Sequence, residues 1–160
     1  MTAPALFPHD AEAMNALYQL SLKANPHGFI QDLSYHGPLA DKAQAWVQAG
    51  GTFLVLKEQA QLVGMGGLRP ISAARAELCK LHVHPQAQGK GYGRRLAEGL
   101  LREAATRGFG TVELHVTVTQ TAAVALYHKL GFAPTQRAVF ETTVGGVPVS
   151  YDTLYMEKAL

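Results

Sequence analysis

Residues that could bind phosphate gather in the middle of this 160-residue chain. The segment from Gln88 to Arg94 reads QGKGYGR and joins an expected strand to an expected helix. Glycine allows positive φ angles and close backbone approach, so successive N–H groups can converge on an anion. The free N–H groups at the start of the following helix add to the same attraction. The segment therefore predicts a phosphate-binding loop.

Three phosphate-binding designs use glycine-rich loops, and the spacing separates them here. A P-loop needs G-x-x-x-x-G-K-[ST], which does not occur in the sequence. A dinucleotide-binding loop needs G-x-G-x-x-G, but its third glycine would fall on Arg94 or on Leu96. The pattern that fits is Q-x-x-G-x-G, formed by Gln88, Gly91 and Gly93.

This hexamer resembles the coenzyme A pyrophosphate loop of the GNAT superfamily of N-acetyltransferases. Residues 123–132 read AVALYHKLGF and are similar to the family's A-x-x-L-Y-x-K-x-G-F signature. Family members usually carry Asn three residues before this segment, where this chain has Gln120. The resemblance covers residues 77–132 and implies acetyl-CoA as the co-substrate. It assigns coenzyme contacts to Leu81, His82, Val83, Gln88, Gly89, Lys90, Gly91, Tyr92, Gly93, Arg94, Gln120 and Lys129.

Acyl transfer from a thioester to an amine needs a base for the amine and a proton donor for the sulfur. An alkyl ammonium has a pKa near ~10.4, so a base must take its proton before or during attack. Glu77 matches the position where many family members place this carboxylate. Tyr127 matches the family's tyrosine, whose hydroxyl points at the coenzyme sulfur. A phenol near ~10 is a weaker acid than a thiol near ~8.5, so hydrogen bonding contributes as much as full proton transfer.

Further residues could take part in this chemistry. His82 and His84 could replace Glu77 as the base, because imidazole titrates near neutral pH. The two also form an H-x-H pair, but no third ligand is in view and we expect no metal site. Cys79 could carry the acyl group covalently. We expect Cys79 to pack in the core instead, since direct transfer needs no such nucleophile.

The chain reads as an α/β fold without linkers or repeats. We expect Asp10 to cap the first helix and Thr119 or Thr121 to cap the last helix. A first strand near residues 5–7 would be short. Helices are expected at 11–24, 39–49, 94–107 and before Gly131, and strands at 52–57, 62–68, 77–84, 111–118, 137–144 and 149–157, with a connection at 69–76. The resemblance implies the GNAT fold, a mixed, mostly antiparallel central sheet with a splayed, bulged central strand and flanking helices, in a single domain over residues 1–160.

The expected central strand, residues 77–84, departs from a period of two. Leu78 falls on one parity and Cys79, Leu81 and Val83 fall on the other, so a regular strand cannot place all four on one face. A regular strand would turn Leu78 to the opposite face, whereas a β-bulge near Cys79 or Lys80 would bring it to the same face. In the resembled family this strand is bulged, and the pantetheine arm lies along its free backbone groups. A backbone N–H freed by the bulge could also stabilise the oxyanion.

Composition limits the remaining choices. The chain is 48% hydrophobic and carries a net charge of +2 with only 16% charged residues, which argues against a nucleic-acid partner. Residues 1–8 lack a basic stretch and a long apolar core, so neither a signal peptide nor a membrane span is predicted. The single cysteine excludes an intramolecular disulfide and suits a reducing, cytoplasmic location. Many relatives dimerise, and the sequence does not decide between a monomer and a homodimer.

We therefore predict an acetyl-CoA-dependent N-acetyltransferase that acts on a small-molecule or peptide amine by direct attack in a ternary complex. A larger acyl group, a hydroxyl acceptor and a non-catalytic acyl-CoA sensor stay open, although a pure binder has no use for an acid and a base. A nucleotide-binding oxidoreductase is disfavoured because the third glycine is missing. The acceptor site is expected between residues 25–38 and 137–152, with Phe29, Tyr35 and His36 as walls, Asp32, Glu141 and Asp152 as cation partners and Arg137 as a carboxylate partner.

Overall fold

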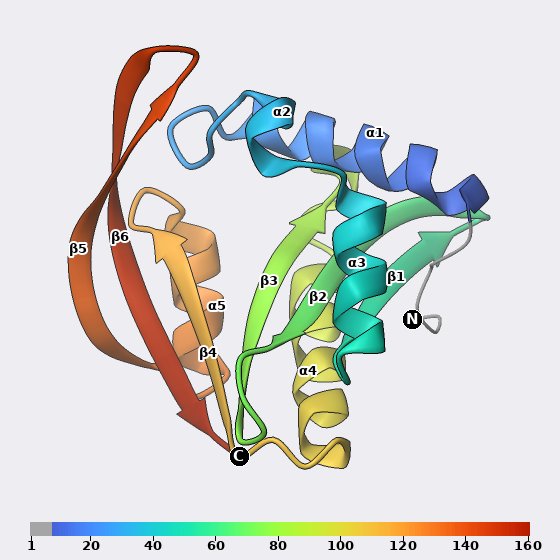
Figure 1. Cartoon of the computed structure of the whole chain (residues 1–160). Coiled ribbons are helices and arrows are strands. Elements are labelled where there is room, and N and C mark those ends of the chain that lie inside the picture. The colour runs from blue at the N-terminus through green and yellow to red at the C-terminus, as the bar shows by residue number, and fades with distance from the viewer. Residues whose placement is uncertain (1–7) are drawn as a thin grey trace.

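One six-stranded sheet organises the chain in a computed structural model that describes residues 8–160, without the side chains of residues 8–10 and 33–34. The strand order is β1-β2-β3-β4-β6-β5 (Figure 1). All neighbouring strands are antiparallel except β3 and β4, which are parallel. The predicted mixed, mostly antiparallel α/β sheet is thus confirmed. The strands are β1 (Thr52–Glu58), β2 (Gln61–Pro70), β3 (Arg75–Val83), β4 (Thr111–Thr117), β5 (Ala133–Val144) and β6 (Val147–Ala159).

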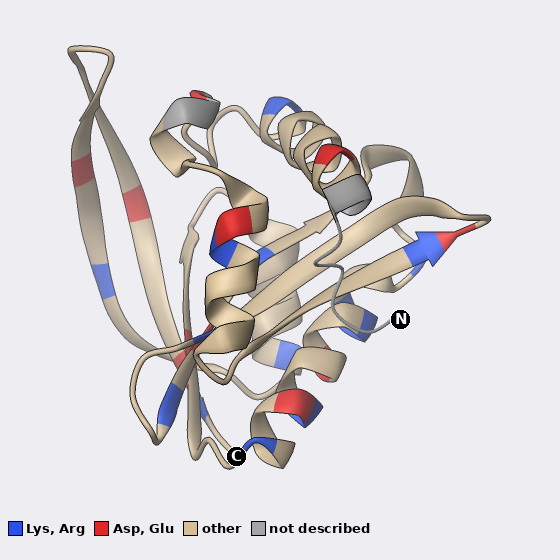
Figure 2. Cartoon of the chain, turned by 45° about the vertical axis from the view of Figure 1, so that its right-hand side comes forward, with Lys and Arg blue, Asp and Glu red and all other residues tan. Residues whose placement is uncertain are grey.

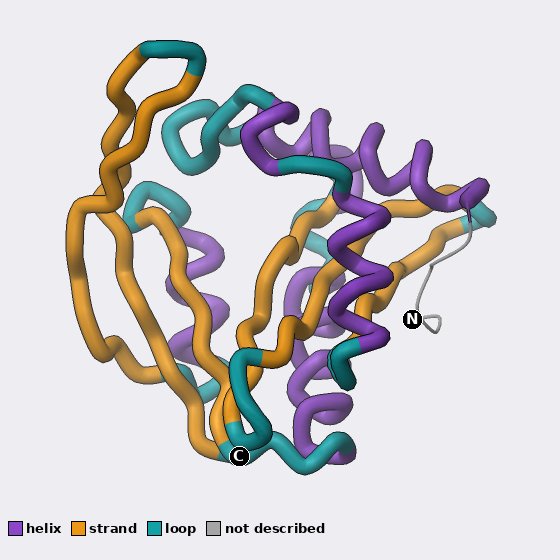
Figure 3. Tube along the Cα trace, in the orientation of Figure 1, coloured by secondary structure: helices purple, strands orange, loops and turns teal. Residues whose placement is uncertain are grey.

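Helices cover both faces of the sheet (Figures 1 and 3). On one face lie α1 (Pro8–Ala24), the short α2 (Leu33–His36) and α3 (Leu39–Gln48), and on the other lie α4 (Tyr92–Thr106) and α5 (Thr121–Lys129). A short 3₁₀ turn, η1 (Pro85–Ala87), follows β3. Because both faces of the sheet are buried, β1 is an unbroken run of apolar residues. Phe53 and Val55 lie in the core under α1 and α3. Leu54 and Leu56 lie in the core under α4.

Three glycines of β2 let helices approach the sheet closely. A Cβ on Gly64 would lie 2.8 Å from Leu96, and one on Gly66 would lie 2.9 Å from Leu100, both residues of α4. On the opposite face a Cβ on Gly67 would lie 2.7 Å from the ring of Trp46 in α3. Because side chains at these positions would collide with packed core residues, the glycines fix the spacing between the layers.

Several predicted boundaries need correction. Helix α1 begins at Pro8, which suits a first helical turn because its missing N–H needs no partner, so Asp10 lies within the helix rather than at its cap. The predicted strand near residues 5–7 lies outside the described residues. Strand β2 runs on to Pro70 and β3 begins at Arg75, so half of the expected connection is strand. Neither threonine caps α5, because Gln120 occupies the N-cap without a side-chain hydrogen bond.

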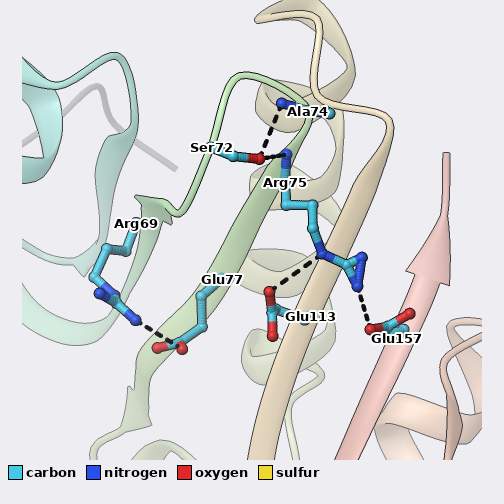
Figure 4. A network of polar contacts seen from close by, with 7 residues as sticks. All are labelled: Arg69, Ser72, Ala74, Arg75, Glu77, Glu113 and Glu157. Carbon is cyan, nitrogen blue, oxygen red and sulfur yellow. Dashed lines mark hydrogen bonds and ion pairs between the residues drawn. The ribbon is translucent and has the colours of Figure 1, made fainter. Parts of the chain in front are cut away.

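Strands β3 and β4 pair only over their first three residues. Arg75 lies opposite Thr111 and Glu77 opposite Glu113, and no later residue of β3 pairs with β4. At this closed end the Arg75 guanidinium lies 3.6 Å from the Glu113 carboxylate and also binds Glu157 of β6 (Figure 4). Beyond Glu77 the two strands diverge, as the Cα trace in Figure 3 shows. The predicted splay is confirmed.

A β-bulge interrupts β3 after Cys79. Met65 of β2 pairs with His82 and Gly67 pairs with Cys79, so Lys80 and Leu81 together lie opposite a single residue of β2. Lys80 has a φ of +56°, which is unusual for a residue with a Cβ. The predicted bulge is confirmed, and it places Leu78 with Leu81 and Val83 in the core beneath α4.

The bulge also corrects one prediction, because Cys79 does not share the face of Leu81 and Val83. With the extra residue at Lys80, Cys79 faces the opposite side of the sheet, where it lines a cavity together with Lys80 and His82.

Acidic and basic residues are interspersed along the ribbon in Figure 2. In the part of the chain that the structure describes, no helix has the length and apolar character needed to cross a bilayer.

Candidate active site

A cavity of about 660 Å³ opens where β3 and β4 separate. It is walled by α1, the loop that follows it, α2, α3, the strands β2 to β4 and the closing hairpin. The loop reaches across the opening, because the Thr117 hydroxyl at the end of β4 donates to the carbonyl of Gly28 at 2.9 Å. Side chains that define the cavity are Tyr18, Phe29, Tyr35, His36, Lys42, Trp46, Arg69, Glu77, Cys79, Lys80, His82, His115, Gln120, Phe140 and Tyr151.

Glu77 lies at the point where the strands part. It is the last residue of β3 that pairs with β4, and its side chain lines the cavity with only 15% exposed. Arg69 on β2 donates to its carboxylate at 3.1 Å (Figure 4). This hydrogen bond and the charge of Glu77 raise the pKa of Arg69. The pair holds an oriented carboxylate at the vertex of the opening, in a position to accept a proton from a group that enters the cavity.

The glycine loop lies at the far end of β3 and leads into α4. Gly89 and Gly91 have φ angles of +82° and +80°, and no atom lies within 4 Å of a Cβ built on either. A Cβ on Gly93 would make only ordinary contacts, 3.7 Å to Leu126 and 3.9 Å to Val83. Nothing in the folded chain therefore requires glycine at position 93. A ligand that comes close to the backbone would require it.

Helix α4 begins earlier than predicted, at Tyr92. The first helical hydrogen bond runs from the N–H of Arg95 to the carbonyl of Gly91, at 3.0 Å. The N–H groups of Tyr92, Gly93 and Arg94 precede it and have no partner in the helical ladder. These N–H groups lie at the positive end of a helix, which is the arrangement that the predicted anion site requires.

The side chains of the loop are held by neighbours within the chain. Lys90 lies 3.3 Å from Glu58 at the tip of the first hairpin, and the Tyr92 hydroxyl donates to the same carboxylate. These hydrogen bonds, from Tyr92 first and then Lys90, lower the pKa of Glu58. Arg94 is ion-paired with Glu98 one turn later, at 2.8 Å. The loop is therefore anchored to β1, while its backbone stays open.

Gln88 links the loop to the strand before it, because its side-chain amide donates to the carbonyl of Val83 at 3.4 Å. Gln120 lines the cavity from the start of α5. Lys129 lies in the last turn of the same helix and is exposed. Of the predicted coenzyme contacts, Leu81, His82 and Val83 form the part of β3 that has no pairing with β4.

Tyr127 of α5 is only 7% exposed in the core beneath α4 and α5, with its ring edge-on to Phe132. Burial, and to a lesser degree the charge of Cys79, raises the pKa of its phenol. Among the described residues, none forms a hydrogen bond with its hydroxyl. The hydroxyl oxygen is not among the fully buried polar atoms that lack a partner, so it keeps some exposure and can donate to a ligand atom.

The two histidines predicted as substitute bases lie in different surroundings. His82 is buried, and its Nδ1 lies 2.7 Å from the Ser21 hydroxyl of α1. Burial, with smaller effects from Lys80 and His36, lowers the pKa of His82 to about 3, so its ring is a very weak base. His84 instead accepts a hydrogen bond from the N–H of Gln86 and caps the 3₁₀ turn. The H-x-H pair therefore does not converge on a common point, and the described residues contain no cluster able to hold a metal.

The thiol of Cys79 lies 3.8 Å from the carbonyl of Gly67, and burial raises its pKa to about 12. A thiol with this pKa carries almost no thiolate at neutral pH and is a poor nucleophile. Cys79 therefore lines the cavity and does not pack in the core as expected, whereas its raised pKa is consistent with the expectation that it does not react.

The acceptor walls were predicted only in part. Phe29, Tyr35 and His36 line the cavity as expected, and Phe140 and Tyr151 represent the closing hairpin. The charged residues proposed as acceptor partners do not line it. Arg137 and Asp152 bind each other at 2.6 Å on the exposed hairpin, whereas Asp32 and Glu141 are exposed.

Apart from Glu77, the charged residues that line the cavity were missed, because they come from segments assigned to other roles. Lys80 lies inside the central strand and Lys42 on α3. From α1, Tyr18 is hydrogen-bonded to Lys80 and Ser21 to His82. A lysine between the apolar residues Cys79 and Leu81 of a central strand was the one signal that could have identified Lys80.

The sequence matches those of known proteins over most of its length. Residues 14–132 match the sequence profile of the Acetyltransferase (GNAT) family. The N-acetyltransferase YjgM of Escherichia coli K12, described as uncharacterized, is 32% identical over 92 residues, 56% of this chain and 55% of that protein. The IAA acetyltransferase of Azospirillum brasilense is 36% identical over 109 residues, 68% of this chain and 67% of that protein. A mycothiol acetyltransferase of Salinispora tropica is 40% identical over 99 residues, 59% of this chain and only 32% of that protein.

Solved structures share the fold over nearly the whole chain. A ribosomal-protein-alanine N-acetyltransferase from Brucella melitensis has a TM-score of 0.81 at 22% identity, covering 99% of this chain and 98% of that one. The acetyltransferase yncA from Salmonella typhimurium, determined with acetyl-CoA, has a TM-score of 0.78 at 22% identity, covering 99% of this chain and 92% of that one.

Proposed function

Since this chain belongs to the GNAT family of acetyltransferases, we propose that it transfers an acetyl group from acetyl-CoA to a primary amine, by direct attack in a ternary complex. The observation that carries the proposal is the separation of β3 from β4 immediately after Glu77, with Glu77 in the cavity and the glycine loop at the other end of β3. One strand thus connects an anion site to a carboxylate. A long thioester with a pyrophosphate group matches this layout.

The coenzyme contacts follow from free backbone groups. The N–H groups at Gly89 to Arg94 would hold the pyrophosphate, and the unpaired edge of Leu81 to Val83 would hold the pantetheine arm as an added strand. Gln120 and Lys129 on α5 would contact the coenzyme from the side of β4. The space beside Gly93 supports this assignment, because a side chain there would narrow the approach to the helix N-terminus.

The chemical step is assigned to two side chains and one backbone group. Glu77 takes a proton from the amine, directly or through water, and Arg69 keeps its carboxylate oriented. A backbone N–H at the bulge stabilises the oxyanion as the amine adds. Tyr127 donates to the departing sulfur. Its raised pKa favours a hydrogen bond over full proton transfer.

Binding is tested first, by thermal shift with acetyl-CoA, CoA and NAD in parallel. At about one hundred times the dissociation constant a ligand adds about 2.7 kcal/mol of unfolding free energy, or roughly 5 to 10 °C here. Both CoA forms should shift the melting temperature and NAD should not. No shift with either CoA form would refute the proposal.

Turnover is then followed as thiol release with a panel of primary amines. Glu77→Gln and Tyr127→Phe should each lower kcat more than tenfold while the shift with acetyl-CoA persists. Glu113→Gln is the matched control, because Glu113 pairs with Glu77 across the strands but does not line the cavity.

The same assays distinguish the remaining functions. Binding of acetyl-CoA without turnover of any amine would favour the acyl-CoA sensor. Turnover of hydroxyl acceptors would favour an O-acyltransferase, and turnover of longer thioesters would favour transfer of a larger acyl group. A homodimer and a cytoplasmic location stay predictions.

A further inference from the structure

We infer that the acceptor is a compact primary amine that also carries a carboxylate, which the Lys80 ammonium and the Tyr18 hydroxyl bind inside the cavity. The inference rests on the proposed acetyl transfer and adds the chemical class of the acceptor.

The charges that line the cavity are predominantly positive. Lys42, Arg69 and Lys80 are cationic, and Glu77 is the only carboxylate among the described residues that line it. Glu77 is bound to Arg69, so its charge is already balanced. The other titratable groups are His36, His82, His115, Cys79 and tyrosines. An anionic group on the ligand would complement this surplus of positive charge.

Lys80 is the cation that most needs such a partner. Its Nζ donates to the Tyr18 hydroxyl at 2.9 Å and lies 5.0 Å from the centre of that ring. No carboxylate of a described residue lies within ion-pair distance of it. Burial, and then the nearby Lys42, lowers the pKa of Lys80. An ammonium in this position is stabilised when an anion approaches, because desolvation then has an opposite charge to offset it.

Tyr18 completes a two-donor arrangement. Its hydroxyl accepts from Lys80, so its own proton is free to be donated to an oxygen of the ligand. Burial raises the pKa of the phenol, so the proton stays on the hydroxyl at any ordinary pH. An ammonium and a hydroxyl side by side match the two oxygens of a carboxylate.

The backbone at Lys80 also points to a function for this side chain. Lys80 has a φ of +56°, a conformation that strains a residue with a Cβ and that glycine would adopt without strain. In a regular strand Lys80 would lie on the same face as Leu78, which is in the apolar core, whereas the bulge places Lys80 on the cavity face beside Cys79. Strained backbone of this kind gathers at ligand sites.

The rest of the cavity indicates an apolar body for the acceptor. Phe29, Trp46, Phe140 and Tyr151 supply aromatic walls. An acceptor with several amines and no carboxylate would meet Lys42 and Lys80 without compensation and is disfavoured. An amino acid with an apolar side chain has all the required parts.

The test uses Trp46, the single tryptophan of the chain, which lines the cavity and reports on its occupancy by fluorescence. 3-Phenylpropionate and its uncharged amide are titrated with and without saturating CoA. The parent protein should bind the carboxylate at least tenfold more tightly than the amide. Lys80→Met should abolish the difference, Lys80→Arg should keep it, and Tyr18→Phe should reduce it. The exposed Lys23→Met serves as the control that leaves it unchanged.

Equal binding of the two probes by the parent, no fluorescence response to either, or an undiminished preference in Lys80→Met would overturn the inference. If Lys80→Met does not fold, as judged by its unfolding transition, loss of preference in Tyr18→Phe decides the question. Acetyl-CoA binding is measured separately by thermal shift. A shift with acetyl-CoA together with equal binding of the probes would leave acetyl transfer standing and remove only the acceptor class.

Discussion

Acidification should destabilise this protein through the buried ring of His82. The ring is buried and its pKa in the folded chain is about 3, whereas an unfolded histidine titrates near ~6.5. Between these values the unfolded chain binds the extra proton and the folded chain does not. The free energy of unfolding therefore rises with pH over this range and falls on acidification. From pH 8 to pH 5 the loss is about 2 kcal/mol, or roughly 4 to 8 °C in melting temperature.

Urea unfolding of the parent and of His82→Gln at pH 5, 6, 7 and 8 isolates this effect. The substitution changes stability at every pH, because it alters the contact with Ser21. The informative quantity is therefore the change in unfolding free energy between pH 8 and pH 5. This decrease should be about 2 kcal/mol smaller in His82→Gln than in the parent. The exposed His27→Gln should keep the slope of the parent. If the decreases in unfolding free energy from pH 8 to pH 5 agree within about 0.5 kcal/mol for the parent and His82→Gln, His82 is not held neutral by burial.

Three glycine substitutions separate folding from coenzyme binding. Gly91→Ala should lower the free energy of unfolding by about 1 kcal/mol, because a Cβ is strained at a φ of +80°, and urea unfolding measures this. Gly93→Ala should stabilise the fold by up to ~1 kcal/mol, because a Cβ has room at this helical position. The same substitution should lower the affinity for acetyl-CoA at least tenfold in a thermal-shift titration. Unchanged affinity would contradict the proposed approach of the coenzyme to this residue. Gly51→Ala should lose more than about 3 kcal/mol or not fold, because its Cβ would lie 2.0 Å from the carbonyl of Leu68, and a cooperative parent-like transition would be the contrary result.

Sequence reasoning succeeded where local chemistry decides the structure. The glycine loop needs positive φ angles, and Gly89 and Gly91 adopt them. The broken period of the central strand indicated a bulge, because apolar residues on both parities of a strand with one core face require an extra residue. These features depend on a few neighbouring residues, so the sequence carries them directly.

Sequence reasoning failed where distant segments decide. The pairs Ser21–His82 and Tyr18–Lys80 join residues about sixty positions apart, through the way α1 packs on β3. Nothing near His82 in the sequence shows that its ring is buried, so it was a reasonable base until the packing was known. Arg137 was assigned to the acceptor site by its place on the hairpin, but its side chain binds Asp152 on the same exposed surface.

The bulge explains how one strand serves both the core and the site. A regular β3 with Leu81 and Val83 in the core would turn Leu78 into the cavity, exposing an apolar side chain there. The extra residue at Lys80 returns Leu78 to the core and turns Glu77 to the cavity side. The same residue interrupts the backbone pairing where the oxyanion would form, and its own ammonium enters the cavity. Under the proposed function, the strain at Lys80 would thus serve oxyanion stabilisation through geometry and acceptor binding through charge.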